Sequence, residues 1–438
     1  MTRCTRTAIA LALFVLFATA CSSTPPGGTA LPSTPGRPSG TRSGAASAPT
    51  PSPAAEPASE TTRVNAPPGG TLLVHGSYPK VDSRCVGYHR PRLAARYPGA
   101  LSVRRSDDGT LSLTVTLTFE DYLKGIAEVP PSWPRAALEA QAIAARSYAL
   151  ASTGWEGAQG ETLKTPICAT TSCQVYRGIP VPFDPAVRRW FGAVRRTTAQ
   201  VLLYEGRPAD TVYFSTSNGH TYGNDEVFGS APLPYLRPVV ERDDGASPLS
   251  HWRVRLPFDD VATFLHEAGD WPAHRPVTGV GLDGSTVTVE GGGRRRSMDL
   301  TTFRDAVNTW GPCLEPGRYP PSPLPVTLPS PWMTMTSGPD AAFAVGRGWG
   351  HGVGMVQWGA YGKARRGLSA SQILGYYYGG LRPEPYPEPG LIHVQVASGL
   401  TSIRVVPSEA GATVEGQPLD ARTVTIAGGD HLSVTPGT

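Results

Sequence analysis

The stretch FEDYLKGIAEVPPSWPRAALEAQAIAARSYAL, residues 119–150, decides how the chain is interpreted. Apolar residues at helical spacing predict a helix over 120–128, and an alanine-rich run predicts a second over 135–152. Ser132 suits the cap of the second helix and Pro134 its first turn. Between the helices Glu128 stands among residues that carry no charge. Because a buried carboxylate without a partner is costly, we expect Glu128 to be held by hydrogen bonds or to take part in proton chemistry.

The segments around this stretch mix both kinds of secondary structure. Alternating apolar residues and turn dipeptides predict hairpins over 101–119, 194–216 and 277–291. A strand and a helix are expected over 251–269, and another helix over 369–378, which opens with a capping box and stops at two glycines. We therefore predict an α+β fold of hairpins and a few packed helices over residues 71–390, with residues 391–438 as a possible small β module.

The first 21 residues have the features of an export signal. A short basic start precedes an apolar run of 14 residues, 7–20, which is shorter than the roughly 20 residues that a membrane-spanning helix needs. Small residues directly before Cys21 resemble the lipobox of bacterial lipoproteins, in which this cysteine is lipidated. Ordinary signal cleavage nearby is the alternative.

Residues 22–70 contain 11 prolines, 7 glycines and no aromatic residue, so they predict a disordered linker. The formal net charge is +4, and no long basic run points to nucleic acid. We expect an exported protein on the outer face of the cytoplasmic membrane or in the cell wall, which contacts the membrane through its N-terminal lipid only.

Three segments together carry a family resemblance. They are residues 119–150, VYFSTSNGHTYGNDEVFG (212–229) and GRGWGHGVGMVQWGAYGKARRGLSASQILGYYYGG (346–380). In this order and spacing they resemble the SpoIID/LytB family over roughly residues 100–385. Members include lytic transglycosylases that cut peptidoglycan glycan strands lacking stem peptides, and enhancers that stimulate a cell-wall amidase. The resemblance implies that peptidoglycan glycan strands are the binding partner. If the protein is an amidase enhancer, a cell-wall amidase is a further partner.

Glu128, in the motif AEVP, matches the catalytic glutamate of this family. A lytic transglycosylase uses one acid to protonate the bridging oxygen and, as carboxylate, to accept the proton of the muramic acid C6 hydroxyl. Such an acid needs a pKa well above about 4.3, which burial provides. Lys124 lies one helical turn earlier, and contact with it would keep Glu128 ionised. The structural alternative is a glutamate that only binds backbone amides at a helix end.

Further substrate contacts are expected from all three segments, and the predicted residues are Arg146, Tyr148, Ser215, Ser217, Asn218, His351 and Gln357. Hydroxyls, amides and imidazole suit sugar hydroxyls and acetamides, although a polar turn of this kind also satisfies itself. Alternate glycines from 346 to 354 allow close backbone approach. Trp349 and Trp358 fit either a saccharide groove or the core.

Hydrolysis of the glycan strand, with Asp225 or Glu226 as the base, is a third possible function, beside the lytic transglycosylase and the amidase enhancer.

Four cysteines remain once Cys4 leaves with the signal and Cys21 takes lipid. In an oxidising compartment Cys168 and Cys173 favour a disulfide, which leaves Cys85 and Cys313 to pair by elimination. Some family members hold zinc in this region, so the resemblance implies a zinc site at Cys168 and Cys173 as a less favoured alternative, beside free thiols. No cofactor is otherwise expected.

Overall fold

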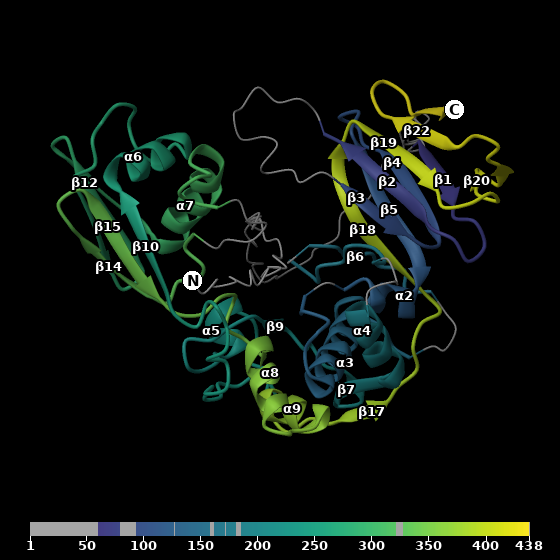
Figure 1. Ribbon diagram of the computed structural model, residues 1–438, viewed down its shortest axis with the longest axis horizontal. Helices are drawn as coiled ribbons and strands as arrows, with labels where there is room; N and C mark the ends of the chain where they lie inside the picture. The colour runs from purple at the N-terminus through teal and green to yellow at the C-terminus, as the bar shows by residue number, and fades with distance from the viewer. Residues whose placement is uncertain are drawn as a thin grey trace, which may run out of the picture.

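The computed structural model describes residues 60–78, 93–126, 128–157, 162–170, 172–180, 185–320 and 327–437. The predicted signal segment 1–21 with Cys21, most of the linker and Cys85 lie outside these residues. Within them, helices alternate with strands, and the strands form several sheets (Figure 1). The predicted α+β class is confirmed. No helix among the described residues has the length and apolar character that crossing a bilayer requires.

Two sheets enclose the largest core. The first has the strand order β21-β20-β1-β4-β5-β18-β6, and the second the order β23-β22-β19-β2-β3. The bounds in the first sheet are β1 (Thr61–Asn65), β4 (Ala100–Arg105), β5 (Leu111–Thr118), β6 (Ile167–Cys168), β18 (Leu391–Leu400), β20 (Thr413–Val414) and β21 (Gln417–Pro418). Those in the second are β2 (Leu72–Ser77), β3 (Ala94–Tyr97), β19 (Ser402–Pro407), β22 (Thr423–Ala427) and β23 (Ser433–Gly437). Buried side chains of both sheets belong to one apolar cluster.

Strands from the two ends of the chain pair with each other in both sheets. β18 lies antiparallel to β5, and β19 lies antiparallel to β2. β1 pairs with β4 and β20, although its residues fall inside the segment 22–70 for which the sequence predicts a linker. Residues 391–437 therefore contain the expected β structure, but their strands complete the sheets of the N-terminal strands and share their core.

Helices and short strands form a second layer below these sheets in Figure 1. Their bounds are α2 (Phe119–Lys124), α3 (Arg135–Ser152), α4 (Pro185–Arg196), β7 (Gln200–Tyr204), β8 (Arg207–Pro208), β9 (Tyr213–Phe214), α5 (Asn224–Phe228), β16 (Met355–Val356), α8 (Gln357–Arg365), α9 (Ala370–Tyr377) and β17 (Pro383–Pro385). Small buried residues of α3 such as Ala140 and Ala144 pack against apolar residues of β16, α8 and α9. This packing brings the three motif segments together.

Residues between β9 and β16 also build a separate lobe, at the left of Figure 1. It contains β10 (Trp252–Pro257), α6 (Phe258–Glu267), β11 (Gly279–Asp283), β12 (Thr286–Gly291), β13 (Arg294–Asp299), α7 (Leu300–Leu314), β14 (Met333–Ser337) and β15 (Ala341–Gly346). The lobe has its own apolar core between its sheets and helices. The chain enters and leaves it at one place, since the Gly348 amide donates to the Leu249 carbonyl at 2.8 Å.

Most predicted elements are present, with shifts at two helix ends. The first helix ends at Lys124 rather than near 128, because Gly125 caps it and the chain then turns to pair with another segment. The second helix covers 135–152 as predicted, but its N-cap is Pro134 without a side-chain bond, not Ser132. The Ser369–Gln372 capping box is confirmed at the start of α9.

Candidate functional site

Glu128 lies on the loop between α2 and α3, and a neighbouring segment holds this loop in place. The Gly125 carbonyl accepts from the Arg177 amide, and Ile126 forms a bridge with Tyr176. A Cβ on Gly125 would lie 2.1 Å from the Tyr176 ring, so only glycine allows this approach. The Val175 amide donates to Glu128 Oε1 at 2.5 Å. The carboxyl group is thereby fixed against residues 175–177, which follow the loop that contains the two cysteines.

The Glu128 carboxyl group is favoured in its protonated form. The residue as a whole is half-buried, but protein atoms enclose its carboxyl, and this burial raises the pKa of Glu128 to about 7. The Val175 amide, the Tyr213 hydroxyl and the Arg177 charge act in the opposite direction and lower the pKa. Desolvation outweighs all three, so the carboxyl can hold or release a proton near neutral pH.

Lys124 does not contact Glu128. Its ammonium group pairs with Glu120 at 2.9 Å and with Asp121 at 3.1 Å, and it lies over the Phe191 ring. The cation that would have kept Glu128 ionised is therefore engaged with carboxylates on its own helix.

Tyrosines surround the Glu128 carboxyl. Tyr122, Tyr148 and Tyr213 all lie close enough for its charge to raise the pKa of their phenols, although burial is the larger cause in each case. The Tyr122 and Tyr213 hydroxyls are buried without a hydrogen-bond partner of standard geometry. Tyr213 still faces the carboxyl closely enough to lower its pKa. Unsatisfied buried hydroxyls are costly, so the chain keeps these two phenols beside Glu128 at a cost in stability.

Sequence reasoning missed two of these tyrosines. Tyr122 is fully buried among the apolar residues of α2, and nothing in the sequence indicates that its hydroxyl lies near Glu128. Tyr213 lies inside the second motif segment, two residues before Ser215, and its place in that segment is the available signal. Tyr148 was predicted, and it lies half-buried beside the carboxyl.

His351 and Gln357 hold the backbone of the site. His351 Nδ1 accepts from the Val353 amide, so Nε2 carries the hydrogen and donates to the Tyr213 carbonyl at 2.9 Å. Burial lowers the pKa of His351 to about 4, which keeps the ring neutral. Gln357 Nε2 donates to the Glu128 carbonyl at 3.3 Å. Both residues belong to the site, and their polar groups position Tyr213 and Glu128 instead of pointing at a substrate.

The polar turn after β9 is mostly self-satisfied. The Ser217 amide and hydroxyl both donate to Asp244 at 2.8 Å. Asn218 Nδ2 donates to the Tyr222 hydroxyl, and its Oδ1 is buried without a partner. The Ser215 carbonyl accepts from the Trp358 amide, which joins the second motif segment to the third. Asn218 therefore retains one free acceptor, whereas Ser217 is committed to the loop.

Arg146 is not available to a substrate. Its side chain is 1% exposed, and its guanidinium donates to Glu388, to the Thr197 hydroxyl and to the Val194 carbonyl. The prediction of a substrate contact here is wrong, because the inward face of α3 directs this cation into the core. It ties α3 to α4 and to the segment before β18.

The carboxylates suggested for hydrolysis have other partners. Asp225 pairs with Arg237 at 3.2 Å, and Glu226 accepts from the Gly223 amide at the start of α5. A different carboxyl, that of Asp210, lies near Tyr148. Burial raises the pKa of Asp210. Burial, with a smaller contribution from the Asp210 charge, raises the pKa of Tyr148 to about 12. No sequence pattern pointed to Asp210.

A buried charge cluster fixes α8 and thereby Gln357. Lys363 Nζ lies 3.0 Å from Glu241 and 3.0 Å from Asp243, and Lys363 and Glu241 are almost fully buried.

The glycine before β16 allows a close approach between two strands. A Cβ on Gly354 would lie 2.0 Å from the Val212 carbonyl. The φ of Gly354 is +76°, a value that glycine adopts without strain. This close approach lets β16 run beside β9.

Cys168 and Cys173 are joined by a disulfide in the structure. Disulfide sulfurs are not the thiolates that zinc requires, and the described residues contain no group of three or more His, Cys, Asp or Glu side chains arranged to hold a metal. The residues present thus do not fit a zinc ion. Cys85 lies outside the described residues, so its pairing with Cys313 stays a prediction.

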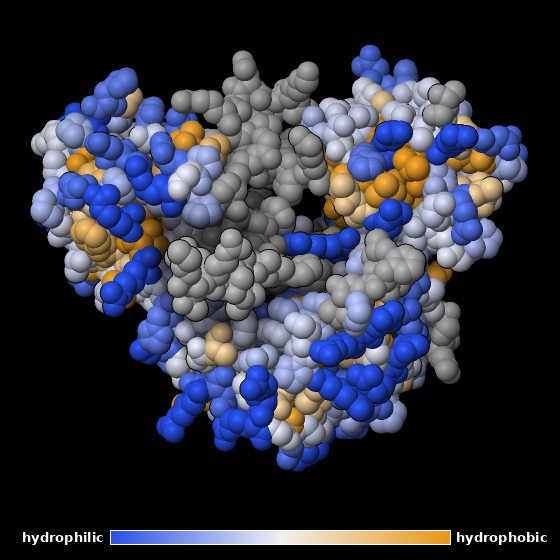
Figure 2. Space-filling model, viewed as in Figure 1, coloured by the Kyte–Doolittle hydropathy of each residue, from blue (hydrophilic) through white to orange (hydrophobic). Residues whose placement is uncertain are grey.

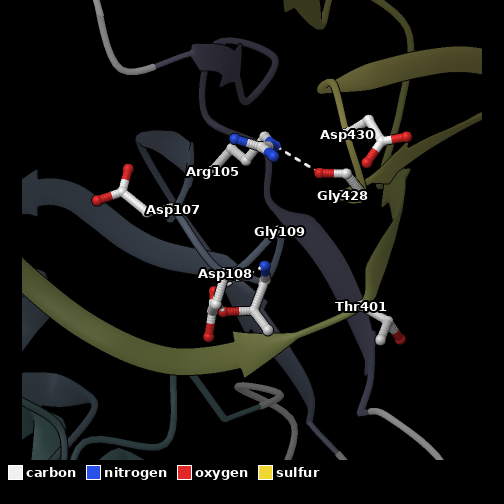
Figure 3. Close-up of a pocket in the computed structure, with 9 residues that line it drawn as sticks. Arg105, Asp107, Asp108, Gly109, Thr401, Gly428 and Asp430 are labelled. Atoms are coloured by element: carbon white, nitrogen blue, oxygen red, sulfur yellow. Dashed lines mark hydrogen bonds between the residues drawn. The ribbon is translucent and has the colours of Figure 1, made fainter.

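One cavity lies far from this site. It is lined by the β4–β5 turn and by residues near Thr401 and Asp430 (Figure 3), at the opposite end of β5 from α2. Arg105 donates there to the Gly429 carbonyl. The carboxylates of Asp107, Asp108 and Asp430 do not converge in Figure 3, and nothing links this cavity to Glu128.

The family match found by comparison with known proteins covers the first motif segment. Residues 107–204, which include Glu128, match the SpoIID family, described as Stage II sporulation protein. An uncharacterized protein of Brachyspira hyodysenteriae is 30% identical over 290 residues, which cover 65% of this chain and 71% of that protein. The chain belongs to the SpoIID family.

Two further relatives carry functional names. Stage II sporulation protein D of Bacillus subtilis is 29% identical to this SpoIID-family chain over 273 residues, 60% of the chain and 74% of that protein. The amidase enhancer of Bacillus subtilis is 27% identical over 297 residues, 59% of the chain but only 39% of the enhancer. The family resemblance read from the sequence is thereby confirmed.

Proposed function

We propose that this protein acts on the bacterial cell wall and cleaves peptidoglycan glycan strands by a lytic transglycosylase mechanism. The observation that carries the proposal is the Glu128 carboxyl, whose pKa burial raises to about 7 and which lies beside the phenols of Tyr122, Tyr148 and Tyr213. The names of its relatives, which concern sporulation and an amidase enhancer, support a role at the wall. We also propose export with a lipid on Cys21.

In this mechanism one carboxyl group serves two successive steps. Protonated Glu128 gives its proton to the oxygen that links muramic acid to the next sugar, and the bond from C1 to that oxygen breaks. The resulting carboxylate stabilises the positive charge that develops at C1. It then accepts the proton of the C6 hydroxyl as the C6 oxygen bonds to C1. The product is a 1,6-anhydro ring, Glu128 is protonated again, and no water is consumed.

The surrounding residues position the Glu128 carboxyl and adjust its pKa. The Val175 amide fixes Oε1 of Glu128, so a substrate would approach the other oxygen. Tyr213 stabilises the ionised form, which helps Glu128 give up its proton in the first step. His351 and Gln357 fix the backbones of these two residues and thereby the distance between carboxyl and phenol.

The test is product analysis on peptide-free glycan strands in ¹⁸O-labelled water. We expect anhydro-muramic ends without ¹⁸O from wild type and from Glu156→Gln, a matched exchange at an exposed glutamate, and no product from Glu128→Gln. Reducing ends that contain ¹⁸O would show hydrolysis and refute the transglycosylase. In that case loss of activity in Asp210→Asn would identify the second carboxylate.

The second candidate is a wall-binding protein that stimulates an amidase without cutting glycan. The similarity to the amidase enhancer favours it. A cell-wall amidase is assayed with and without this protein, and Glu128→Gln is compared with wild type. Stimulation that survives in the variant, together with no glycan products from wild type, would establish this function in place of the first.

A further inference from the structure

A basic cavity of about 440 Å³ lies beside the Glu128 loop. Four arginines and two aromatic residues dominate its lining, namely Arg135, Arg189, Arg196, Arg365, Trp133 and Tyr361. Its volume falls in the range of cavities that bind small ligands. Figure 2 shows strongly hydrophilic residues gathered over the region where Figure 1 places α4, which supplies two of these arginines.

The positive charge of this cavity is only partly neutralised. Glu139 accepts from Arg135 at 2.7 Å and from Arg196 at 2.6 Å. Arg189 donates to the Ser132 carbonyl at 3.4 Å, and Arg365 donates to the Tyr361 hydroxyl at 3.3 Å. Among the described residues the lining contains no carboxylate. Arg189 and Arg365 thus keep donors for an anion, and planar guanidinium groups match carboxylates in geometry as well as in charge.

Aromatic rings form the apolar wall of the cavity. The Trp133 ring centroid lies 5.2 Å from that of Tyr361 and 4.9 Å from that of Trp358. Trp133 and Leu138 are buried, and Tyr361 is half-buried. Rigid aromatic surface beside cationic groups suits a ligand that carries both apolar ring faces and negative charge. A simple inorganic anion would use only the second feature.

The cavity shares two structural elements with the Glu128 site. Ser132 and Trp133 belong to the same loop as Glu128. Gln357, at the start of α8, donates to the Glu128 carbonyl. Tyr361 and Arg365 follow Gln357 at intervals of four residues, so they lie about 6 and 12 Å further along the same face of α8. A chain molecule bound at Glu128 and lying along this face of α8 would pass Tyr361 and Arg365.

We infer that this cavity is a subsite for the carboxylate of a muramic acid residue in the bound glycan strand. The inference rests on the proposed function, because it takes the occupant of the Glu128 site to be peptidoglycan. Arg189 and Arg365 bind the carboxylate, and the Trp133 and Tyr361 rings contact the sugar. In a peptide-free strand the carboxylate belongs to the lactyl group, and in a peptide-bearing strand the stem peptide carries it.

Binding is measured by calorimetry in a Glu128→Gln background, in which the strand stays intact. The variant is the full chain with Arg189→Gln and Arg365→Gln together, and the matched control is Arg188→Gln, an exposed arginine of the same helix outside the cavity. The ligands are peptide-free glycan fragments, the same fragments with their carboxyl groups reduced to alcohols, and peptide-bearing fragments. Unchanged thermal unfolding confirms that each variant is folded.

We expect the parent and the control to bind natural fragments about tenfold more tightly than reduced fragments, and the double variant to bind both equally. If peptide-bearing fragments bind as tightly as unreduced peptide-free fragments, the cavity also accepts a carboxylate of the stem peptide. If they bind more weakly, the cavity accepts the carboxylate of the lactyl group. Equal binding of natural and reduced fragments by the parent would overturn the inference, as would a preference that survives in the double variant.

Two arms separate this inference from other outcomes. If poly-glutamate binds more tightly than glycan and only that binding is lost in the double variant, the cavity is a docking site for an acidic protein and the inference fails. Because every measurement uses glutamine at position 128, absence of glycan cleavage by wild type would refute the proposed function and leave this binding result standing.

Discussion

Replacing Glu128 by glutamine should make the protein relatively more stable as the pH rises. In the folded protein burial raises the pKa of Glu128 from 4.5 to about 7. The unfolded chain releases the proton near pH 4.5, whereas the folded chain keeps it until about pH 7. The stability from this proton is fully present below pH 4.5 and is lost as the pH rises through 7. Glutamine resembles the protonated acid and does not titrate.

The expected magnitude follows from the pKa change. One pKa unit corresponds to about 1.36 kcal/mol, so wild type should lose up to about 3 kcal/mol relative to Glu128→Gln between pH 4.5 and pH 8.5. This figure is an upper bound, because the half-buried residue retains some contact with solvent. The glutamine carbonyl can still accept from the Val175 amide, so the loop keeps its hydrogen bond.

Urea unfolding at several pH values measures the effect, and hydrogen exchange of the Val175 amide reports it locally. Glu156→Gln serves as the control, since its exposed side chain has no enclosing protein. We expect the unfolding curves of wild type and Glu128→Gln to agree at pH 4.5 and to separate above pH 6, with faster Val175 exchange in wild type. Parallel pH dependences would show that the carboxyl is solvated and that the reasoning about its proton is wrong.

Three further changes test neighbouring features. Tyr213→Phe removes a group that lowers the pKa of Glu128, so the alkaline limb of the pH–rate profile of glycan cleavage should move to higher pH; a move to lower pH contradicts this. Lys363→Met leaves buried carboxylates without their cation and should reduce the free energy of unfolding by about 3–5 kcal/mol, against less than 1 kcal/mol if the cluster is solvated. Replacing Cys168 and Cys173 by serine together opens a short closed loop and should cost about 2 kcal/mol in urea unfolding; unchanged stability would mean that the disulfide constrains nothing.

Local signals predicted the local structure well. The alternation in residues 111–118 gives a strand whose apolar side chains all enter the core, and the alanine-rich run gives α3 at its predicted bounds. The partners of these elements were not predictable in this way. Nothing local indicates that β18 pairs with β5, because the contact joins residues far apart in the chain.

The candidate site shows a similar division. Glu128 was found because an isolated acid in an apolar turn coincided with a family motif. The sequence predicts His351 and Gln357 as substrate contacts. Both lie near Glu128, but their bonds to the Tyr213 and Glu128 carbonyls could not be predicted from residue type. A polar side chain in a motif can serve the backbone as well as a ligand, and only the three-dimensional arrangement separates these roles. Arg146 is the extreme case, since α3 turns it away from any ligand.

The two connections of the lobe from β10 to β15 to the rest of the chain lie next to each other, where the Gly348 amide donates to the Leu249 carbonyl. A lobe connected in this way can change in length, or be absent, without a change in the path of the remaining chain, because its first and last residues are already in contact. A short bridge of a few residues would span them in an engineered version.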